Sequence, residues 1–419
     1  MSAEPRLHPI LAAAFRTFGD ARISWCLLSD AAELAEPIGT VDLLIDRSHA
    51  KRASERLAGL GFVRQSAASS HGGQAHFVMY WAPTDLWIRL RTVTMLGFGP
   101  RGSLRTGAEA GCLARRRHAG CVSLLADDDA FWMMLLGAVL GGGPLSPPWR
   151  ARLQSMAEDA RSDGEMAAMV DRVCPAGWNA SRMLAAARRA DWHALEKLGP
   201  LLDRSWRREQ GLHAWIRTPF SGRSIGDLSR TLVDRPGISI ALLGPDGAGK
   251  STLAAALARS PCPVKCIYMG LWQRSCDPPS RLNITGLAWS MRILKSWGRY
   301  AMARMYLALG YLVIFDRYTF DALLPSGTPQ DRLRKIASWL LAHACPAPDL
   351  VFVLDAPGSV MYARKGEHRP DYLEAQRQRF LTLIDLLPNA RAIDATREAD
   401  VVRRDVLDHV WRRVSAGAG

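Results

Sequence analysis

The 419-residue sequence lacks several features that would assign it to a functional class at once. Its eight cysteines include no C-x-x-C pair and no Cys/His cluster with zinc-binding spacing, so we expect no zinc site. The net charge is +14, yet no block of five or six consecutive basic residues occurs, and we expect no nucleic-acid partner. The longest apolar run, residues 131–140, is too short to span a bilayer.

The N-terminus also lacks a cationic start followed by a long apolar run, so no signal peptide is expected. Scattered thiols in a long chain fit a reducing compartment. Together these absences predict a cytoplasmic protein with no membrane partner. No internal repeat and no low-complexity segment is present.

What is present is the composition of a globular protein, with 48% hydrophobic and 22% charged residues. The length favours two or three domains. Changes in pattern along the chain predict four parts: an α+β domain, a helical region, a linker punctuated by Pro and Gly, and an α/β domain. Their expected ranges are 1–122, 123–210, 211–236 and 237–419.

Short apolar runs bounded by turn residues predict strands, and 3.6-residue periodicity predicts helices. In the first region the expected strands are 24–29, 41–45, 76–81 and 86–93, with a helix at 49–60. In the second region the expected helices are 126–139, 149–163, 164–172 and 181–198.

The last region alternates strands and helices. The expected strands are 238–243, 264–269, 311–315, 350–354 and 390–393, and helical segments fill the intervals between them. This alternation is typical of an α/β fold with a parallel sheet and helices on both faces.

Residues 244–252, GPDGAGKST, match the phosphate-binding pattern G-x-x-x-x-G-K-[ST] between an apolar strand and a helix-forming run. Glycines allow consecutive amides to point at phosphate oxygens, and the helix N-terminus adds its dipole. Lys250 is expected at the β and γ phosphates and the Ser251 hydroxyl on Mg²⁺. The predicted nucleotide-binding residues are Gly244, Gly247, Ala248, Gly249, Lys250, Ser251 and Thr252, and the predicted cofactors are ATP and Mg²⁺.

Two further charged segments follow strands. Asp316 and Arg317 come directly after the strand at 311–315, where ligands bind in open α/β sheets. We expect Asp316 to hold Mg²⁺ and Arg317 to clamp phosphate, with a loop salt bridge as the alternative. The basic segment 364–369 either closes over the transferred phosphoryl group or forms a solvated turn.

Four segments resemble, in their order along the chain, the thymidylate kinase family of nucleoside monophosphate kinases. They are the motif at 244–252, Asp316-Arg317-Tyr318, the turn and strand at 348–355, and the late Asp394-Ala395-Thr396. The resemblance implies that Asp246 positions the acceptor nucleotide. It also implies that Arg364 and Arg369, in a lid, replace an arginine that one class of the family carries in its phosphate-binding loop. Family members are often dimers, so a homodimer is implied as well.

One segment departs from that family. Residues 268–273, YMGLWQ, contain no carboxylate where the family has an Arg-Glu-Pro-type segment that helps bind the acceptor. The acceptor of this chain is therefore expected to differ from, or only resemble, dTMP. Trp272, Trp289 and Trp297 either line an altered acceptor pocket or pack in the core.

Near the N-terminus, residues 39–46, GTVDLLID, resemble the nucleotidyltransferase superfamily, which carries Gly-Asp-x-Asp on a strand and a third carboxylate on a later strand. Here Thr40 replaces the first Asp, Asp42 is kept, and Arg91 falls near the third position. Asp46 lies about 13 Å from Asp42 along an extended strand, too far to share one ion. The resemblance therefore predicts a nucleotidyltransferase-like fold without transferase activity. The run 127–129, DDD, is expected to cap a helix.

Three hypotheses for the whole chain follow. The first is an ATP- and Mg²⁺-dependent kinase that acts on a nucleoside monophosphate or a related small acceptor. The second is an active nucleotidyltransferase with a regulatory phosphate-loop domain, against which the missing carboxylates count. The third is a nucleotide sensor that binds ATP without phosphoryl transfer.

Overall fold

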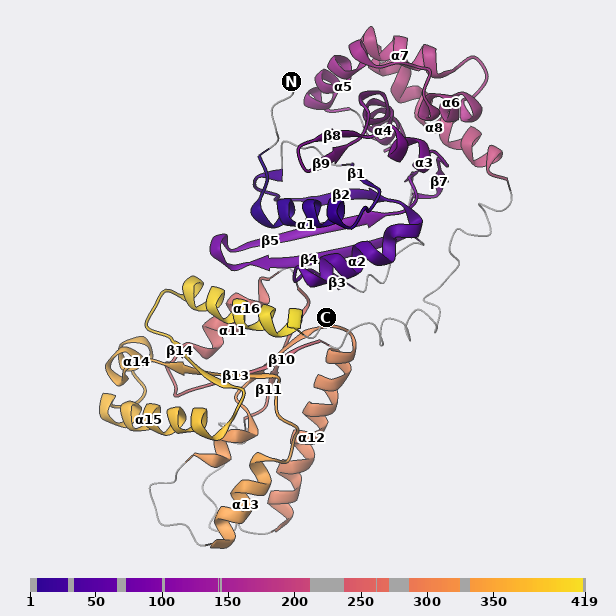
Figure 1. The fold of residues 1–419 in the computed structure, drawn as a ribbon. Helices are drawn as coiled ribbons and strands as arrows, with labels where there is room; N and C mark the ends of the chain where they lie inside the picture. The colour runs from indigo at the N-terminus through magenta and orange to yellow at the C-terminus, as the bar shows by residue number, and fades with distance from the viewer. Residues whose placement is uncertain are drawn as a thin grey trace. The chain divides into compact units, whose positions relative to one another are not determined.

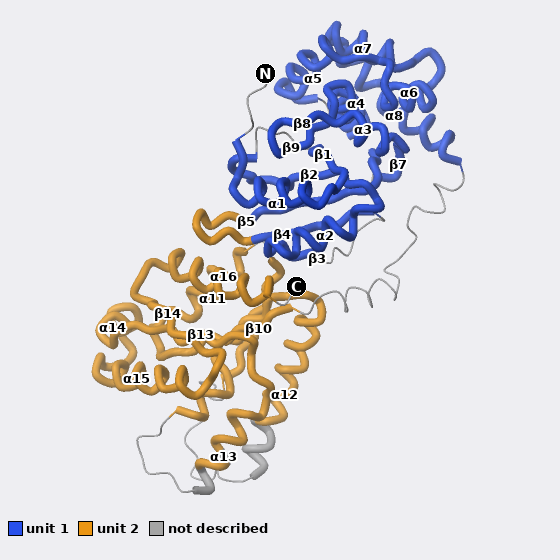
Figure 2. Tube along the Cα trace, viewed as in Figure 1, with its two compact units in different colours: residues 1–79, 87–224, 418–419 blue, residues 80–86, 225–417 orange. Residues whose placement is uncertain are grey.

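The computed structural model describes residues 6–28, 34–65, 73–99, 102–141, 143, 145–211, 237–260, 262–270, 286–324 and 332–416. Contacts divide the chain into two compact units (Figure 2), of which unit 1 comprises residues 1–79, 87–224 and 418–419 and unit 2 residues 80–86 and 225–417. Almost all of the predicted linker, 211–236, lies outside the described residues. Within the described part, no helix combines the length and apolar character needed to cross a bilayer.

Unit 1 contains a seven-stranded mixed sheet in the order β3-β4-β5-β2-β1-β9-β8. Its central strands β2 and β5 run parallel, and β1 pairs with β2 antiparallel. The strands are β1 Trp25–Leu27, β2 Thr40–Ile45, β3 Val63–Gln65, β4 Gln74–Trp81, β5 Leu86–Val93, β8 Arg117–Ala119 and β9 Val122–Leu124. A separate pair is formed by β6 Gly97–Phe98 and β7 Leu104–Arg105.

The helices of unit 1 are α1 Pro9–Asp20, α2 Ala50–Gly59, α3 Glu109–Ala114, α4 Asp127–Leu140, α5 Pro147–Asp159, α6 Glu165–Val173, α7 Ala180–Arg188 and α8 Trp192–Glu209. One hydrophobic core joins the sheet to the helices that follow it, from Cys26 and Leu44 to Trp206. The apolar run 131–140 forms most of α4 and is buried at Phe131, Trp132, Leu135, Leu136 and Val139. The second region of the sequence therefore shares its core with the first.

One helix prediction is wrong in this region. Residues 181–198 do not form a single helix, because the chain breaks between α7 and α8. Ala190 adopts a left-handed conformation (φ +55°), and the Asp191 side chain accepts a hydrogen bond from the amide of Ala194, which caps the new helix.

Unit 2 contains the parallel sheet that the sequence predicts. Its five strands lie in the order β11-β12-β10-β13-β14, and every neighbouring pair is parallel. They are β10 Ser239–Leu243, β11 Val264–Tyr268, β12 Leu312–Asp316, β13 Leu350–Asp355 and β14 Ala390–Asp394. β10 is buried throughout, as expected of a central parallel strand covered on both faces.

Helices cover both faces of this sheet (Figure 1). α11 (Lys250–Ala258) and α16 (Ala399–Ala416) pack against each other, whereas α12 (Gly286–Ala308) and α15 (Pro370–Leu386) join the core formed by alternate strand residues such as Leu243 and Phe315. The remaining helices of unit 2 are the 3-10 helix η5 Thr319–Leu323, α13 Arg332–Ala342 and α14 Gly358–Lys365. The α/β class expected for residues 237–419 is confirmed.

The strand order fixes where a ligand can bind. β10 lies between β12 and β13 in the sheet: the chain runs from β10 to β11 on one side of it, and then crosses from β12 to β13 on the other side. In open α/β sheets, ligands bind outside the carboxyl ends of strands at such a switch point. The loop after β10 and Asp316 at the end of β12 lie at this edge.

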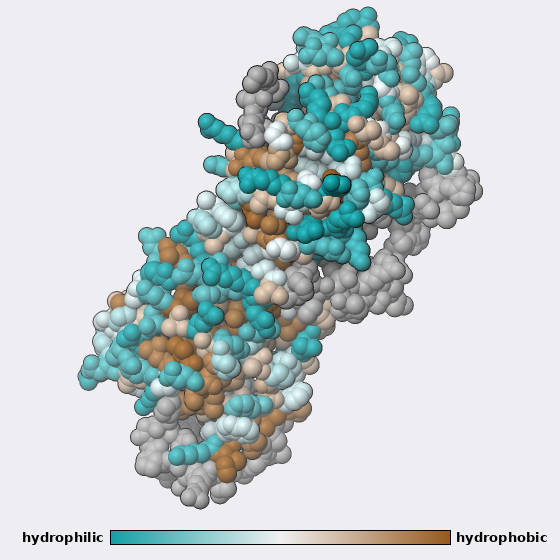
Figure 3. All heavy atoms as spheres, viewed as in Figure 1, coloured by the Kyte–Doolittle hydropathy of each residue, from teal (hydrophilic) through white to brown (hydrophobic). Residues whose placement is uncertain are grey.

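Hydrophobic side chains are also exposed on unit 2. They gather where α12 and α13 lie on the face shown in Figure 3. The large exposed ones on these helices are Leu294, Trp297, Met302, Met305, Ile336, Trp339 and Leu340.

Candidate phosphate-binding site

The loop between β10 and α11 has the backbone that the glycine pattern predicts. Gly244, Gly247 and Gly249 all have positive φ angles, of 143°, 87° and 97°. Only glycine adopts such angles without strain, and they let the chain curl at the N-terminus of α11. Ser251 and Thr252 fall in the first turn of α11 and are exposed. The arrangement offers backbone amides and a helix dipole to an anion.

Gly247 also has no room for a side chain. A Cβ atom built there would lie 2.6 Å from the carbonyl oxygen of Met361 in α14. Backbone cannot yield as the end of a flexible side chain does. An arginine at position 247 would therefore clash with α14 unless the loop moved.

Lys250 is folded back onto the loop. Its Nζ donates hydrogen bonds to the carbonyl oxygens of Gly244 (2.8 Å) and Pro245 (2.7 Å), and lies 4.0 Å from Oδ1 of Asp246. Burial, together with the nearby guanidinium of Arg317, lowers the pKa of Lys250 to about 8. A buried ammonium held mainly by neutral carbonyls is a good partner for an anionic ligand.

Arg317 follows β12 in a left-handed conformation (φ +63°), which is uncommon for a residue with a side chain. Its amide donates to the carbonyl of Leu242 in β10 (3.2 Å), and its guanidinium donates to Oδ1 of Asp246 (2.9 Å). The structure thus brings Asp246 and Arg317 together as an ion pair. Unusual backbone conformations of this kind concentrate at functional sites.

A cavity of about 880 Å³ opens in front of the loop. Its walls bring together most of the predicted residues: Asp246, Gly247, Gly249, Lys250, Ser251, Thr252, Asp316, Arg317 and Arg364. Tyr268 and Lys365 complete the lining. We call it the donor cavity. Oxygen ligands that suit Mg²⁺, the Ser251 hydroxyl and the Asp316 carboxylate, both face it.

A second cavity, of about 360 Å³, also has Asp246 and Arg317 in its walls. It is lined by the start of the loop (Gly244, Pro245), by Asp321 and Leu324, and by His368, Tyr372, Leu373, Gln376, Arg379 and Phe380. We call it the acceptor cavity. Asp246 and Arg317 line both cavities, so the ion pair marks the place where the two meet.

The two arginines of the predicted lid, Arg364 and Arg369, differ in whether they line a cavity. Arg364, at the end of α14, lines the donor cavity and donates to the backbone carbonyl of Ala395 (2.8 Å), beside the Asp394-Ala395-Thr396 segment. Arg369 is exposed at the N-cap of α15 and lines neither cavity. Its predicted role at the transferred phosphate therefore stays a prediction.

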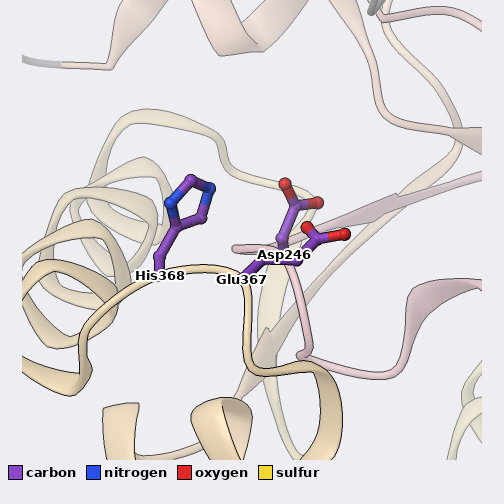
Figure 4. A group of neighbouring side chains, drawn as sticks. All are labelled: Asp246, Glu367 and His368. Carbon is purple, nitrogen blue, oxygen red and sulfur yellow. The ribbon is translucent and has the colours of Figure 1, made fainter.

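Glu367 and His368 lie in the turn between α14 and α15, close to Asp246 (Figure 4). One ligand atom from each of the three lies within 4.8 Å of the others. Both carboxylates already face cations, because Asp246 binds Arg317 and Glu367 binds Lys365 (3.1 Å). This group therefore fits a metal poorly, but it shows that the turn reaches the phosphate-binding loop.

Apart from Gly244, Asp246 and Arg317, the residues that line the acceptor cavity were not predicted from the sequence. Tyr372, Gln376, Arg379 and Phe380 recur at helical spacing and so form one face of α15, a signal that was available. Asp321 follows Arg317 by four residues on η5 and gave no such signal. Of the three tryptophans, Trp272 and the Trp289 side chain lie outside what is described. Trp297 is 50% exposed, which contradicts packing in the core, and it lines neither the donor cavity nor the acceptor cavity.

In unit 1, Asp42 on β2 lies opposite Arg91 on β5 in the strand register, and the Arg91 guanidinium donates to both carboxylate oxygens. The distance from Nε to Oδ1 is 2.7 Å. Asp46 lies beyond the end of β2, where its carboxylate caps η2 (Arg47–His49) through Ser48. Thr40 is exposed at the start of β2.

The three aspartates at the start of α4 bind three different partners. Asp127 and Asp129 form ion pairs with Arg117 and Arg115, and Asp128 accepts a hydrogen bond from the amide of Arg161. They occupy the first turn as predicted, where acidic residues stabilise the helix N-terminus, and the N-cap residue is Ala126. Their carboxylates also connect α4 to neighbouring segments.

Comparisons with known proteins leave the family of this chain open. No family model matches it, and no curated protein matches it. Among solved structures, the chain is similar to a thymidylate kinase from Candida albicans, at 22% identity and a TM-score of 0.33, over 42% of this chain and 91% of that one. We base no functional argument on a similarity of this size.

Proposed function

We propose that residues 237–419 bind ATP and Mg²⁺ and transfer the terminal phosphoryl group to a nucleoside monophosphate or a related small acceptor. The observation that carries the proposal is the pair of cavities that meet at Asp246 and Arg317, one of them formed by the glycine loop and Lys250. Phosphoryl transfer needs positioning and charge neutralisation more than covalent chemistry, and this arrangement offers both.

Each residue has a role in this proposal. The loop amides and Lys250 hold the β and γ phosphates, and Ser251 and Asp316 hold Mg²⁺, which neutralises charge on the phosphate oxygens. Arg317 stands where donor and acceptor meet and stabilises charge on the group in transit. Arg364 and Arg369 are the proposed lid cations, of which Arg364 already lines the donor cavity.

A phosphoryl-transfer screen tests the proposal. The full-length protein is offered ATP and Mg²⁺ with nucleoside monophosphates, nucleosides and simple sugars, and acceptor-dependent ADP formation is measured. We expect Lys250→Ala to lower the rate roughly 100- to 1,000-fold, because it removes a fixed cation from the phosphates. ATP binding without turnover of any acceptor would contradict the proposal and favour a nucleotide sensor.

We also propose that unit 1 has a nucleotidyltransferase-like fold that lacks transferase activity. The Asp42–Arg91 pair supports the second part, because a guanidinium that occupies both carboxylate oxygens leaves them no charge to offer a metal. Nucleotide transfer that disappears in Asp42→Ala would contradict this and revive the nucleotidyltransferase hypothesis.

A further inference from the structure

The acceptor cavity contains one acidic side chain whose position calls for a partner. Asp321 lies on η5, and its side chain is only 4% exposed. Neither carboxylate oxygen has a hydrogen-bond partner among the described residues. The nearest cation, Arg317, is 3.9 Å from Oδ2, which is too far for a hydrogen bond, and that guanidinium already donates to Asp246.

The segment around Asp321 is firmly anchored. Tyr318 and Thr319 donate hydrogen bonds to the carbonyls of Pro346 and Ala342, and Phe320 is buried in the core of unit 2. The carboxylate is thus held at the cavity wall.

Such a carboxylate is costly to keep. A buried polar atom without a hydrogen bond destabilises the fold, and a charged one does so more strongly. Burial is the main reason that the pKa of Asp321 rises to about 6; Arg317 and Lys250 oppose the rise, and Asp316 and Asp246 add to it. Asp321 is therefore ionised near pH 7.5. The ionised Asp321 carboxylate lines a cavity beside the glycine loop, which is the position expected of a side chain that binds a ligand.

The remaining walls indicate the kind of ligand. Tyr372 and Phe380 offer aromatic surface for a flat ring, whereas Gln376 and Arg379 are polar. An ionised carboxylate only accepts hydrogen bonds, and its two oxygens suit two adjacent donors. A carbonyl or phosphate oxygen placed against Asp321 would be repelled.

We propose that Asp321 selects the acceptor: the molecule that enters this cavity presents two adjacent O–H or N–H donors to the carboxylate. A sugar cis-diol and the N–H/NH₂ edge of a guanine ring share this chemistry. A 2′-deoxythymidine nucleotide has neither, because its single ring N–H lies between two carbonyls. The inference rests on the proposed function, of which it names the acceptor class.

The test measures binding and turnover separately, with the full-length protein. GMP offers both donor pairs, dGMP only the base edge, CMP only the diol, and dTMP neither. Affinities are measured by calorimetry in the presence of ADP and Mg²⁺, which does not depend on catalysis. We expect at least one of the first three to bind 10- to 100-fold more tightly than dTMP, a range typical of hydrogen bonds to a charged group.

The matched variants are Asp321→Asn and Asp385→Asn, which make the same chemical change inside the cavity and on the exposed surface of α15. We expect Asp321→Asn to lose the preference over dTMP while its ATP affinity is unchanged, and Asp385→Asn to keep both. Retained ATP affinity shows that the variant is folded.

Failure of the inference can be told from failure of the proposed function. Selective binding that depends on Asp321, without any phosphoryl transfer, supports the inference and contradicts the kinase. Equal binding of all four nucleotides, binding of none of them, or a preference that persists in Asp321→Asn would overturn the inference, whatever the turnover.

Discussion

At the scale of single residues, the carboxylate that we propose selects the acceptor, Asp321, also affects the free energy of unfolding of the protein. Folding raises its pKa from 3.8 to about 6, so the native state binds more protons than the unfolded state between these pH values. The free energy of unfolding therefore falls as pH rises through this window, and the full cost is present above about pH 6. The negative charge of Asp321, which we propose selects the acceptor, therefore lowers the free energy of unfolding.

We expect Asp321→Asn to stabilise the protein at pH 7.5 by about 1–3 kcal/mol, toward the lower end because Asn still buries an amide. For a unit of this size that raises Tm by roughly 2–4 °C per kcal/mol. Thermal unfolding at pH 7.5 and pH 4.5 checks the sign: the gain should shrink at the lower pH. A variant that is less stable than the parent at pH 7.5 would show that the carboxylate serves the fold.

Two glycines of the phosphate-binding loop separate strain from steric clash. Both have positive φ angles. A Cβ atom added to Gly247 would lie 2.6 Å from the carbonyl oxygen of Met361, whereas a Cβ atom added to Gly249 would have no atom within 4 Å. We expect Gly249→Ala to cost only the strain, about 1–3 kcal/mol, and Gly247→Ala to cost more and to weaken ATP binding over tenfold, because the loop must move away from α14. ATP titrations and melting curves of the pair measure this; equal losses would contradict it.

The residues differ in how far the sequence reveals them. The glycine loop was predictable because each φ angle demands its residue type in a fixed pattern. The Asp246–Arg317 pair was not, since its partners are 71 positions apart and meet only through the order of the strands. Asp321 could not be predicted for a further reason. It stands out because its carboxylate is buried without a hydrogen-bond partner among the described residues, and no local sequence pattern indicates that.

At the scale of elements, α4 is tied to its surroundings by the acids in its first turn. The Asp129 side chain is fully buried against Arg115, which is 35% exposed, while the Asp127–Arg117 pair is exposed on both sides. We expect Asp129→Ala to lower the free energy of unfolding by about 3 kcal/mol, since it leaves Arg115 without its partner. Asp127→Ala should cost under about 1 kcal/mol. Urea unfolding compares the two, and similar losses would show that both act only as helix-end charges.

Elements were predictable where the pattern is local. The five strands of unit 2 agree with expectation within one or two residues, because each is a short apolar run bounded by turn residues. The single helix expected at 181–198 failed because the break depends on the left-handed backbone of Ala190, and alanine is otherwise a strong helix former. Local backbone hydrogen bonds, from Ala190 to Ala187 and from Asp191 to Ala186, close the end of α7 there.

At the scale of the whole molecule, the two units arrange their charged side chains differently. Unit 1 pairs Asp42 with Arg91, whereas in unit 2 Lys250 and Arg364 line the donor cavity and donate hydrogen bonds to backbone carbonyls. We expect Asp42→Ala to leave ATP affinity and acceptor-dependent ADP formation within twofold of the parent, while Lys250→Ala weakens ATP binding and lowers the rate of ADP formation roughly 100- to 1,000-fold. Loss of these activities in Asp42→Ala, with the fold intact by circular dichroism, would show that nucleotide chemistry depends on unit 1.

The ion pair of Asp246 and Arg317 has a thermodynamic consequence. Since both side chains belong to the walls of both cavities, a ligand that displaces or reorients the pair in one cavity changes the charge that the other presents. Binding at the two cavities is then coupled, and linkage requires the coupling to be reciprocal: whatever factor ATP imposes on acceptor affinity, the acceptor imposes on ATP affinity. Because the two cavities share this ion pair, the molecule bound in each would regulate the binding of the other.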